Sequence, residues 1–312
     1  MVLPDLWTSA MRCSTFIGLV VILRFCITLI RAVWVYFLRP SKNLKKLGSW
    51  AVVTGATDGI GRAWCDVLAQ KGLNVLLISR TEAKLAAASQ EVASKSNVQT
   101  KYTVVDFAHA DEATWKRTAA VMASLDVGVL INNVGLSYDH PEYLEQLSEQ
   151  QIRDMVEVNV TSVNQMTLIA LPAMKDHKKG VIVNIGSAAG SVVPASPLTS
   201  VYAGTKAYVD MFTKSMQVEL AASGVIMQNM APLFVATKMS KIRKSRLDAP
   251  SATQWARAAV RHIGYETTCS PYWFHAFQWY CMARGPTSLL NYYVLNLHLG
   301  FRKGWYKKNK GK

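Results

Sequence analysis

Short apolar runs alternate with stretches of helical length over most of the chain. From residue 50 onward, runs of strand length are WAVVTG, NVLLISR, KYTVVDF, VGVLINNVG and GVIVNIGS, and a segment of helical length separates each from the next. Runs that are apolar throughout, rather than at every second residue, predict strands that are buried on both faces of a parallel sheet. We therefore predict an α/β fold with a doubly wound parallel sheet, formed by one domain over residues 47–312.

The N-terminus has a different pattern. Residues 13–38 read CSTFIGLVVILRFCITLIRAVWVYFL, which is long enough to cross a bilayer as a helix, since roughly 20 residues suffice. Arg24 and Arg31 lie on one helical face of this stretch, and an arginine at the bilayer centre costs about 2.5–3.5 kcal/mol on insertion scales. A helix that lies in the membrane interface is therefore an alternative to one that spans it.

A basic linker follows the apolar stretch. Its cations, which lie on the C-terminal side of the stretch, predict that the following domain faces the cytosol; they are Arg39, Lys42, Lys45 and Lys46. We assign residues 1–46 to a hydrophobic membrane anchor with this linker.

The composition favours anionic partners. The formal net charge is +15 although only 18% of residues are charged, and much of that charge lies in residues 42–46 and 302–312. This placement favours a membrane surface over nucleic acid, for which the sequence offers no recognised module. The five cysteines include no C-x-x-C pair and no histidine at metal-ligand spacing, so we predict neither a disulfide framework nor a metal site.

A glycine-rich turn follows the first predicted strand. In TGATDGIG, residues 54–61, the glycines let backbone N–H groups approach a pyrophosphate at the start of a helix that begins near Ile60. A strand before the turn and a helix after it are the context that a dinucleotide site requires. The candidate cofactor-binding residues of this turn are Gly55, Asp58, Gly59, Ile60 and Gly61.

The next two strands indicate which dinucleotide binds. The second strand ends in Ser79 and Arg80, where an NAD-binding protein usually has an acidic residue for the ribose 2′-hydroxyl. A guanidinium group suits a 2′-phosphate, so we predict NADPH or NADP+ as the cofactor. Asp106 follows the third strand and either accepts a hydrogen bond from the adenine amino group or caps a helix.

Tyr202 and Lys206 lie four residues apart in SVYAGTKAYVD, a stretch that we predict to be helical, so both side chains lie on one face. The same spacing recurs at Tyr306 and Lys310 in WYKKNKGK, which we expect to be a solvated basic tail. The spacing alone does not identify a catalytic pair.

Surrounding motifs distinguish the two copies. From about residue 49 to residue 238 the chain resembles the short-chain dehydrogenases/reductases, Rossmann-type enzymes, because it contains an ordered series of their motifs: TGATDGIG, Asp106, Asn132-Asn133-Val134-Gly135, Asn159, Ser187, and Tyr202 with Lys206. Two features depart from the family pattern: Val134 replaces an alanine, and the loop between Ser187 and Tyr202 is slightly long.

The resemblance implies a role for each of these residues. Tyr202 would donate a proton, and Lys206 would lower the tyrosine pKa and bind the nicotinamide ribose. Ser187 would donate a hydrogen bond to the substrate carbonyl, and Asn159 would hold a water molecule in a proton relay. Asn133 is expected among the cofactor contacts.

One branch of the family fits best. PLFVATKMSKIRK, residues 232–244, together with the N-terminal anchor and the basic tail, resembles the membrane-bound very-long-chain 3-oxoacyl-CoA reductases and the related 17β-hydroxysteroid dehydrogenases. The expected reaction is NADPH-dependent reduction of a long-chain 3-oxoacyl-CoA in fatty acid elongation. The alternatives are steroid ketone reduction and a catalytically silent NADP(H)-binding membrane scaffold.

In this branch the segment after the sixth strand closes over the nicotinamide and the substrate. Thr237 would bind the nicotinamide carboxamide, and four cations would face the phosphates of coenzyme A: Lys238, Lys241, Arg243 and Lys244.

The C-terminal region suggests a location and leaves one role open. The aromatic segment 271–299 fits a core, an acyl-chain pocket or a second membrane contact. Lys308 and Lys310 resemble a dilysine retrieval signal, which favours the endoplasmic reticulum membrane with the catalytic domain in the cytosol. Expected partners are the acyl-CoA substrate, membrane lipid, other elongation enzymes and a second copy of the chain.

Overall fold

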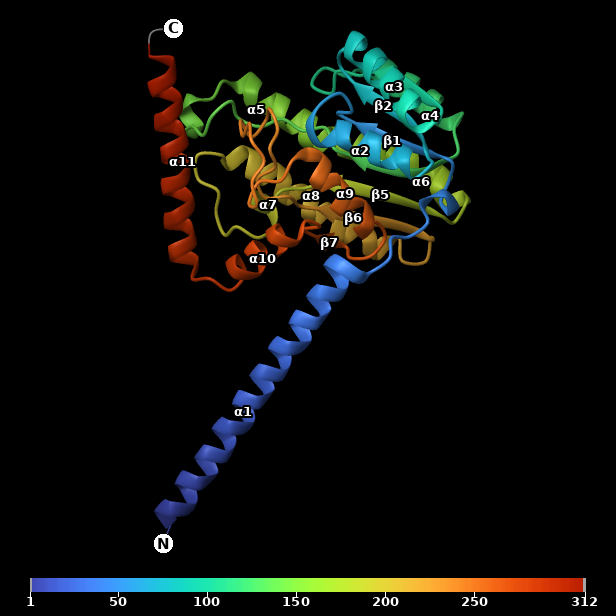
Figure 1. Ribbon diagram of the computed structural model, residues 1–312. Helices are drawn as coiled ribbons and strands as arrows, with labels where there is room; N and C mark the ends of the chain where they lie inside the picture. The colour runs from blue at the N-terminus through green and yellow to red at the C-terminus, as the bar shows by residue number, and fades with distance from the viewer. Residues whose placement is uncertain (1, 311–312) are drawn as a thin grey trace. The chain divides into compact units, whose positions relative to one another are not determined.

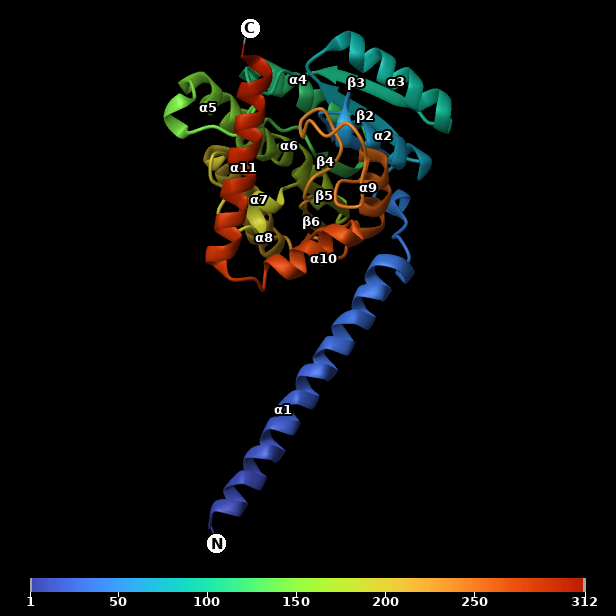
Figure 2. The same cartoon turned by 60° about the vertical axis from the view of Figure 1, so that its left-hand side comes forward.

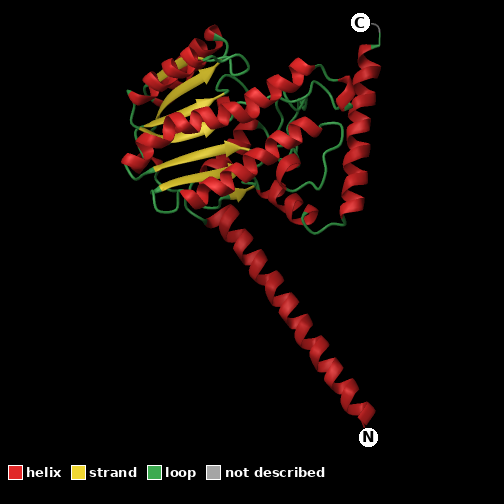
Figure 3. Ribbon diagram, turned by 180° about the vertical axis from the view of Figure 1, so that it is seen from behind, coloured by secondary structure: helices red, strands yellow, loops and turns green. Residues whose placement is uncertain are grey.

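A seven-stranded parallel sheet forms the centre of the structure, a computed structural model that describes residues 2–310 (Figure 3). The strand order is β3-β2-β1-β4-β5-β6-β7, and all neighbouring strands are parallel. This confirms the doubly wound α/β prediction. The strands are β1 Trp50–Thr54, β2 Asn74–Ser79, β3 Thr100–Val104, β4 Val127–Asn132, β5 Gly180–Ile185, β6 Val225–Met230 and β7 Thr268–Cys269.

Helices cover both faces of this sheet (Figures 1 and 2). Those of the globular part are α2 Gly59–Gln70, α3 Glu82–Ser96, α4 Glu112–Ala123, α5 Glu149–Val156, α6 Ser162–Asp176, α7 Ala188–Ser191, α8 Ser200–Glu219, α9 Ala252–Ala259, α10 Trp273–Met282 and α11 Thr287–Asn309. Shorter turns of other helix types are η1 Trp34–Leu38, η2 Leu44–Lys46, η3 Leu144–Gln146, η4 Glu157–Thr161 and η5 Val260–His262.

The two faces of the sheet form two separate cores. Ala51 of β1 packs with Trp64 and Trp255, whose rings meet edge to face at 6.2 Å. The next residue, Val52, points to the opposite face and packs in the cluster that contains Met166. Strands β1, β2, β4 and β5 need apolar residues at successive positions because both of their faces are covered, whereas the edge strand β3 is largely exposed.

The N-terminal helix is a unit of its own. The chain divides into two units between Pro40 and Ser41, and α1 spans Val2–Val33 in the first. Among the described residues, one helical stretch, Trp7–Leu38, is long and apolar enough to cross a membrane, with a mean hydropathy of 2.3. The structure therefore contains the apolar helix that the sequence predicts.

The C-terminal basic segment is helical and its lysines are exposed, but Tyr306 is held by a buried partner, which the expectation of a solvated tail did not include. Tyr306 lies in α11, and its hydroxyl donates a 2.6 Å hydrogen bond to the carboxylate of Glu142. Aromatic side chains stand among the lysines of this helix, and one of them, Trp305, packs on His140. A prediction made from the charges alone does not include these contacts. The last two residues of the candidate retrieval signal, 311 and 312, lie outside the described residues.

Candidate functional site

The candidate site lies at the carboxyl ends of β1, β4 and β5. The sheet order reverses between β1 and β4, and loops at such a switch point diverge to leave a crevice for a ligand. The glycine-rich turn follows β1, Asn133 follows β4, and Ser187 follows β5. Tyr202 and Lys206 reach the same edge from the first turns of α8.

The turn after β1 is a close-packed cradle for an anion. Gly55 and Gly59 have positive φ angles of 66° and 53°, which glycine adopts without strain. A Cβ atom on Gly61 would lie 2.2 Å from the carbonyl oxygen of Gly55. Asp58 caps α2 through the Gly59 N–H at 2.8 Å. Among residues 2–310 the N–H groups of Ile60 and Gly61 have no acceptor, so they can bind phosphate oxygens.

Asn133 fixes this turn to the end of β4. Its side-chain Nδ2 donates to the carbonyl oxygen of Thr54 at 2.9 Å. In return, the Thr54 hydroxyl accepts from the backbone N–H groups of Asn133 and Val134, both at 2.9 Å. These bonds fix the loop after β1 to the loop after β4, on either side of the switch point. The valine that replaces the family alanine keeps its backbone hydrogen bond.

Arg80 and Asp106 lie after β2 and β3, where the adenosine half of a dinucleotide is expected. Arg80 is exposed and forms no ion pair or hydrogen bond with another described residue. The Asp106 carboxylate accepts from the N–H of Ala108 at 3.2 Å and lies 3.3 Å from His109. Asp111 caps α4 instead, so the helix-cap alternative for Asp106 is wrong.

Ser187 lies close enough to Tyr202 to influence its ionisation. Burial raises the pKa of Tyr202, and the nearby Ser187 hydroxyl partly opposes the increase. The Ser187 Oγ also accepts from the Ala189 N–H at 3.2 Å, because Ser187 is the N-cap of the short helix α7. The cap directs the serine hydroxyl toward α8.

Lys206 lies beneath Tyr202 on the same face of α8. Its Nζ donates to the carbonyl oxygen of Ile185 at 2.8 Å and lies 5.9 Å from the centroid of the Tyr202 ring. The side chain is buried, and burial lowers the pKa of Lys206 to about 8. The ammonium group is therefore still the main form at neutral pH. The pKa of Tyr202 nevertheless lies above its ordinary value because of burial, so the lowered tyrosine pKa that the family resemblance implies is not seen.

Asn159 lies in the π-helical turn η4, between α5 and α6. Its Oδ1 accepts from the Leu136 N–H at 2.7 Å, and its Nδ2 donates to the Leu136 carbonyl at 2.8 Å and to the Thr205 hydroxyl at 3.0 Å. A wide turn of this kind often marks a functional position in a helix. The three hydrogen bonds fix the Asn159 side chain to the loop after β4 and to α8.

The segment after β6 crosses the glycine-rich turn. The Thr237 methyl group would contact a Cβ atom on Gly59 at 3.4 Å. The next residue, Lys238, pairs with Asp58 at 2.5 Å. Burial alone would raise the pKa of Asp58, but the bonds from Lys238 and from the Gly59 N–H lower it below its ordinary value. Thr237 therefore lies where the cofactor contacts are predicted.

Two of the four cations expected to face substrate phosphates are already paired. Besides Lys238, Lys241 binds the Asp139 carboxylate at 2.6 Å. Arg243 and Lys244 are exposed and form no ion pair within residues 2–310. Sequence spacing did not indicate these pairs, because they join segments that are far apart in the chain.

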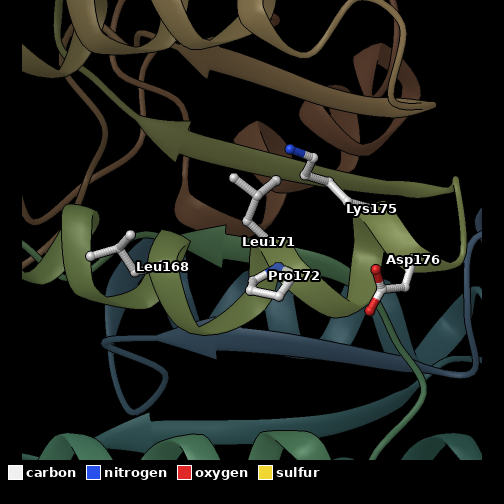
Figure 4. A pocket seen from close by; sticks show the side chains of 5 residues that line it. All are labelled: Leu168, Leu171, Pro172, Lys175 and Asp176. Carbon is white, nitrogen blue, oxygen red and sulfur yellow. The ribbon is translucent and has the colours of Figure 1, made fainter.

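Two further features lie outside the site. A hollow on α6, away from the carboxyl edge of the sheet, is lined by Leu168, Leu171, Pro172, Lys175 and Asp176 (Figure 4). Ligand atoms of His262, Glu266 and Cys269 lie within 4.8 Å of one another. The spacing of the three residues in the sequence does not indicate this group, because they come together only around the turn that precedes β7.

Comparison with known proteins gives consistent matches. A family model described as short chain dehydrogenase matches residues 49–248. The very-long-chain 3-oxoacyl-CoA reductase-B of Danio rerio is 41% identical over 89% of each chain. The very-long-chain 3-oxoacyl-CoA reductase of Homo sapiens is 38% identical over 85% of this chain and 84% of its own.

A solved structure agrees with the fold. The alcohol dehydrogenase from the archaeon Thermococcus sibiricus, complexed with 5-hydroxy-NADP, superposes with a TM-score of 0.60 at 25% identity. The match covers 68% of this chain and 88% of that one.

Proposed function

The chain belongs to the short-chain dehydrogenase family, and from that premise we propose that it is an NADPH-dependent very-long-chain 3-oxoacyl-CoA reductase of fatty acid elongation. It would reduce the 3-keto group of the acyl chain to a hydroxyl group. One observation carries this proposal: relatives with that name are 36–41% identical to the chain over most of their length. The meeting of Ser187, Tyr202 and Lys206 at one edge of the sheet supports it.

The site residues can perform the proton chemistry of this reaction. NADPH, when bound, supplies a hydride to the carbonyl carbon. Tyr202 transfers its hydroxyl proton to the carbonyl oxygen, and the charge of Lys206 stabilises the tyrosinate that remains. Ser187 donates a hydrogen bond to the same oxygen as negative charge develops there. We assign Asn159 to the relay that returns a proton to Tyr202.

The cofactor contacts follow from the cradle and from Arg80. The unpaired N–H groups of Ile60 and Gly61 would bind the pyrophosphate, and Lys206 and Thr237 the nicotinamide end. Arg80 is exposed without a partner among the described residues, as a residue that receives a 2′-phosphate should be. This is our reason for preferring NADPH to NADH.

Replacing Arg80 with alanine should raise the KM for NADPH roughly 10- to 100-fold, because a charge-assisted contact contributes about 1.5–3 kcal/mol. The KM for NADH should change less than about twofold, because NADH has no 2′-phosphate. Steady-state kinetics with both cofactors measures this. Lys116→Ala, an exposed cation on α4, is the matched control. Equal changes for both cofactors in the Arg80 variant would contradict the assignment.

Purified protein assayed with NADPH tests the substrate class. We expect kcat/KM to favour long-chain 3-oxoacyl-CoA over steroid ketones, because Arg243 and Lys244 are free to meet the phosphates of coenzyme A and a steroid has none. Added salt should weaken the acyl-CoA reaction selectively, since it screens exposed charges. A higher kcat/KM for steroids would assign the protein to steroid metabolism. NADPH binding without turnover of either substrate would indicate a silent scaffold.

We further infer that residues 1–46 anchor the protein in the endoplasmic reticulum membrane and that residues 47–312 face the cytosol. The apolar stretch Trp7–Leu38 and the lysines that follow it support this inference. Membrane lipid and other elongation enzymes are the proposed partners. Large exposed apolar side chains on α6 and α8 support a homodimer; they are Leu168, Met211 and Val218.

A further inference from the structure

The C-terminal helix α11 bridges three loops at the carboxyl edge of the sheet. The arrowheads of the strands point toward the side on which α11 stands (Figure 3). Arg302 of α11 bonds to Glu142 in the loop after β4. His298 bonds to the carbonyl oxygen of Pro197, in the loop before α8, at 2.6 Å. The helix is thus bonded to the loop after β4 and to the loop before α8, and both of these loops lead to candidate site residues.

A buried carboxylate holds the helix in this position. Glu142 is only 5% exposed, and its oxygens accept from the Arg302 Nε and the Tyr306 hydroxyl, each at 2.6 Å. Next to it, the His140 ring stacks on Trp305 with 3.7 Å between centroids. Burial alone would raise the pKa of Glu142, but the bonds from Arg302 and Tyr306 lower it to about 2. The carboxylate is therefore ionised and paired at any physiological pH.

The loop held by this ion pair also braces the catalytic candidates. Leu136 forms both backbone bonds to the Asn159 side chain. Two residues later, the Tyr138 hydroxyl accepts from the N–H of Val201 at 3.2 Å, next to Tyr202. The position of α11 is thus connected through one short loop to two candidate site residues.

The helix also contributes an aromatic pair to the entrance. Phe301 of α11 meets Phe234, in the segment after β6, at right angles with 6.3 Å between ring centroids. Both rings remain open to solvent, at 48% and 41% exposure. Phe234 lies three residues before Thr237, on the segment that crosses the glycine-rich turn. Two half-exposed rings at this place offer apolar surface to a long alkyl chain.

We propose that Phe234 and Phe301 bind the acyl chain of the substrate at the entrance, and that the Glu142–Arg302 ion pair is a positioning device that holds Phe301 there. The inference rests on the proposed function, since it assumes a long-chain acyl substrate. A short acyl chain would not reach the pair, so the contact would set the chain-length preference of the enzyme and not its chemistry.

Phe301→Ala tests the aromatic pair, because Phe301 is half exposed and its loss threatens the fold little. With the full-length enzyme in detergent and 3-oxoacyl-CoA substrates of 4 to about 20 carbons, the KM for long chains should rise about tenfold. The KM for the four-carbon substrate, kcat and the Kd for NADPH should change less than about twofold. An unchanged dependence of KM on chain length would overturn the inference.

Arg302→Gln tests the positioning device, with Lys303→Ala as the matched control because Lys303 is the exposed cation next to it. The Arg302 variant should raise the long-chain KM several-fold, and it should add little in the Phe301→Ala background, since both act through one ring. Fully additive effects would overturn the positioning role. A melting temperature identifies any variant that fails to fold, and in that case Phe301→Ala decides alone. If the unmodified enzyme reduces no 3-oxoacyl-CoA of any length, the proposed function fails and this inference fails with it, whereas an active enzyme whose dependence on chain length does not respond to Phe301→Ala overturns the inference alone.

Discussion

Replacing Tyr202 with phenylalanine should lower kcat by about 10²- to 10⁴-fold, the usual contribution of a positioned proton donor. The substitution removes the hydroxyl that Ser187 meets and leaves the ring and its contact with Lys206 in place. The melting temperature and the Kd for NADPH should therefore stay close to those of the unmodified protein. Rapid-reaction kinetics with NADPH and a 3-oxoacyl-CoA would measure the loss in the chemical step.

Tyr208→Phe is the control for this experiment. Tyr208 lies on the same helix, and its hydroxyl donates a 3.0 Å bond to Asn164, away from the candidate site. The Tyr208 variant loses the same atom, so a general effect of removing a tyrosine hydroxyl from α8 would appear in both variants. Turnover by the Tyr202 variant within about tenfold of the unmodified enzyme would exclude Tyr202 as the proton donor.

Gly61→Ala should abolish detectable NADPH binding, with a loss of at least about 100-fold in affinity. The new Cβ atom would meet the Gly55 carbonyl oxygen at 2.2 Å and the Asn133 Nδ2 at 2.4 Å. Both atoms belong to the framework of the cradle, so the turn has to open, and overpacking of this kind typically costs about 1–3 kcal/mol of stability. Calorimetric titration with NADPH and thermal unfolding would record the two effects.

Gly304→Ala provides the contrast, because a Cβ atom there meets nothing within 4 Å among the described residues. Alanine has the higher helix propensity, so this variant should be as stable as the unmodified protein or slightly more so. If Gly61→Ala bound NADPH normally, the turn after β1 would not be the cofactor cradle.

The sequence predicted the central strands because both faces of each are buried, so the apolar signal is continuous. It predicted the glycine-rich turn and the pairing of Tyr202 with Lys206 for a related reason: these features are local, and their spacing is set by one turn or one helix. The two-residue strand β7 gives too short a signal to detect. The π-helical turn at Asn159 has no recognisable sequence pattern.

Contacts between segments that are distant in the sequence account for the other features of the structure that the sequence did not predict. Arg302 is 160 residues from Glu142, and Lys238 is 180 residues from Asp58. Glu142 lies in a stretch, DHPEYLEQ, that reads as a solvated loop. Its burial depends on a helix that packs over it from the far end of the chain. The i, i+4 spacing of Arg302 and Tyr306 was the available clue, since it puts both side chains on one helical face.

The separation between Glu142 and Arg302 also has a consequence for synthesis. The strands of the sheet and every candidate site residue emerge from the ribosome before α11, the last described helix. Before α11 is made, the Glu142 carboxylate has neither the charge of Arg302 nor the hydrogen bond from Tyr306. Burying the carboxylate without these partners would cost desolvation free energy, so we expect its loop to stay exposed to solvent. We therefore expect a nascent chain to build the nucleotide cradle first and to bury Glu142 only once α11 has been made.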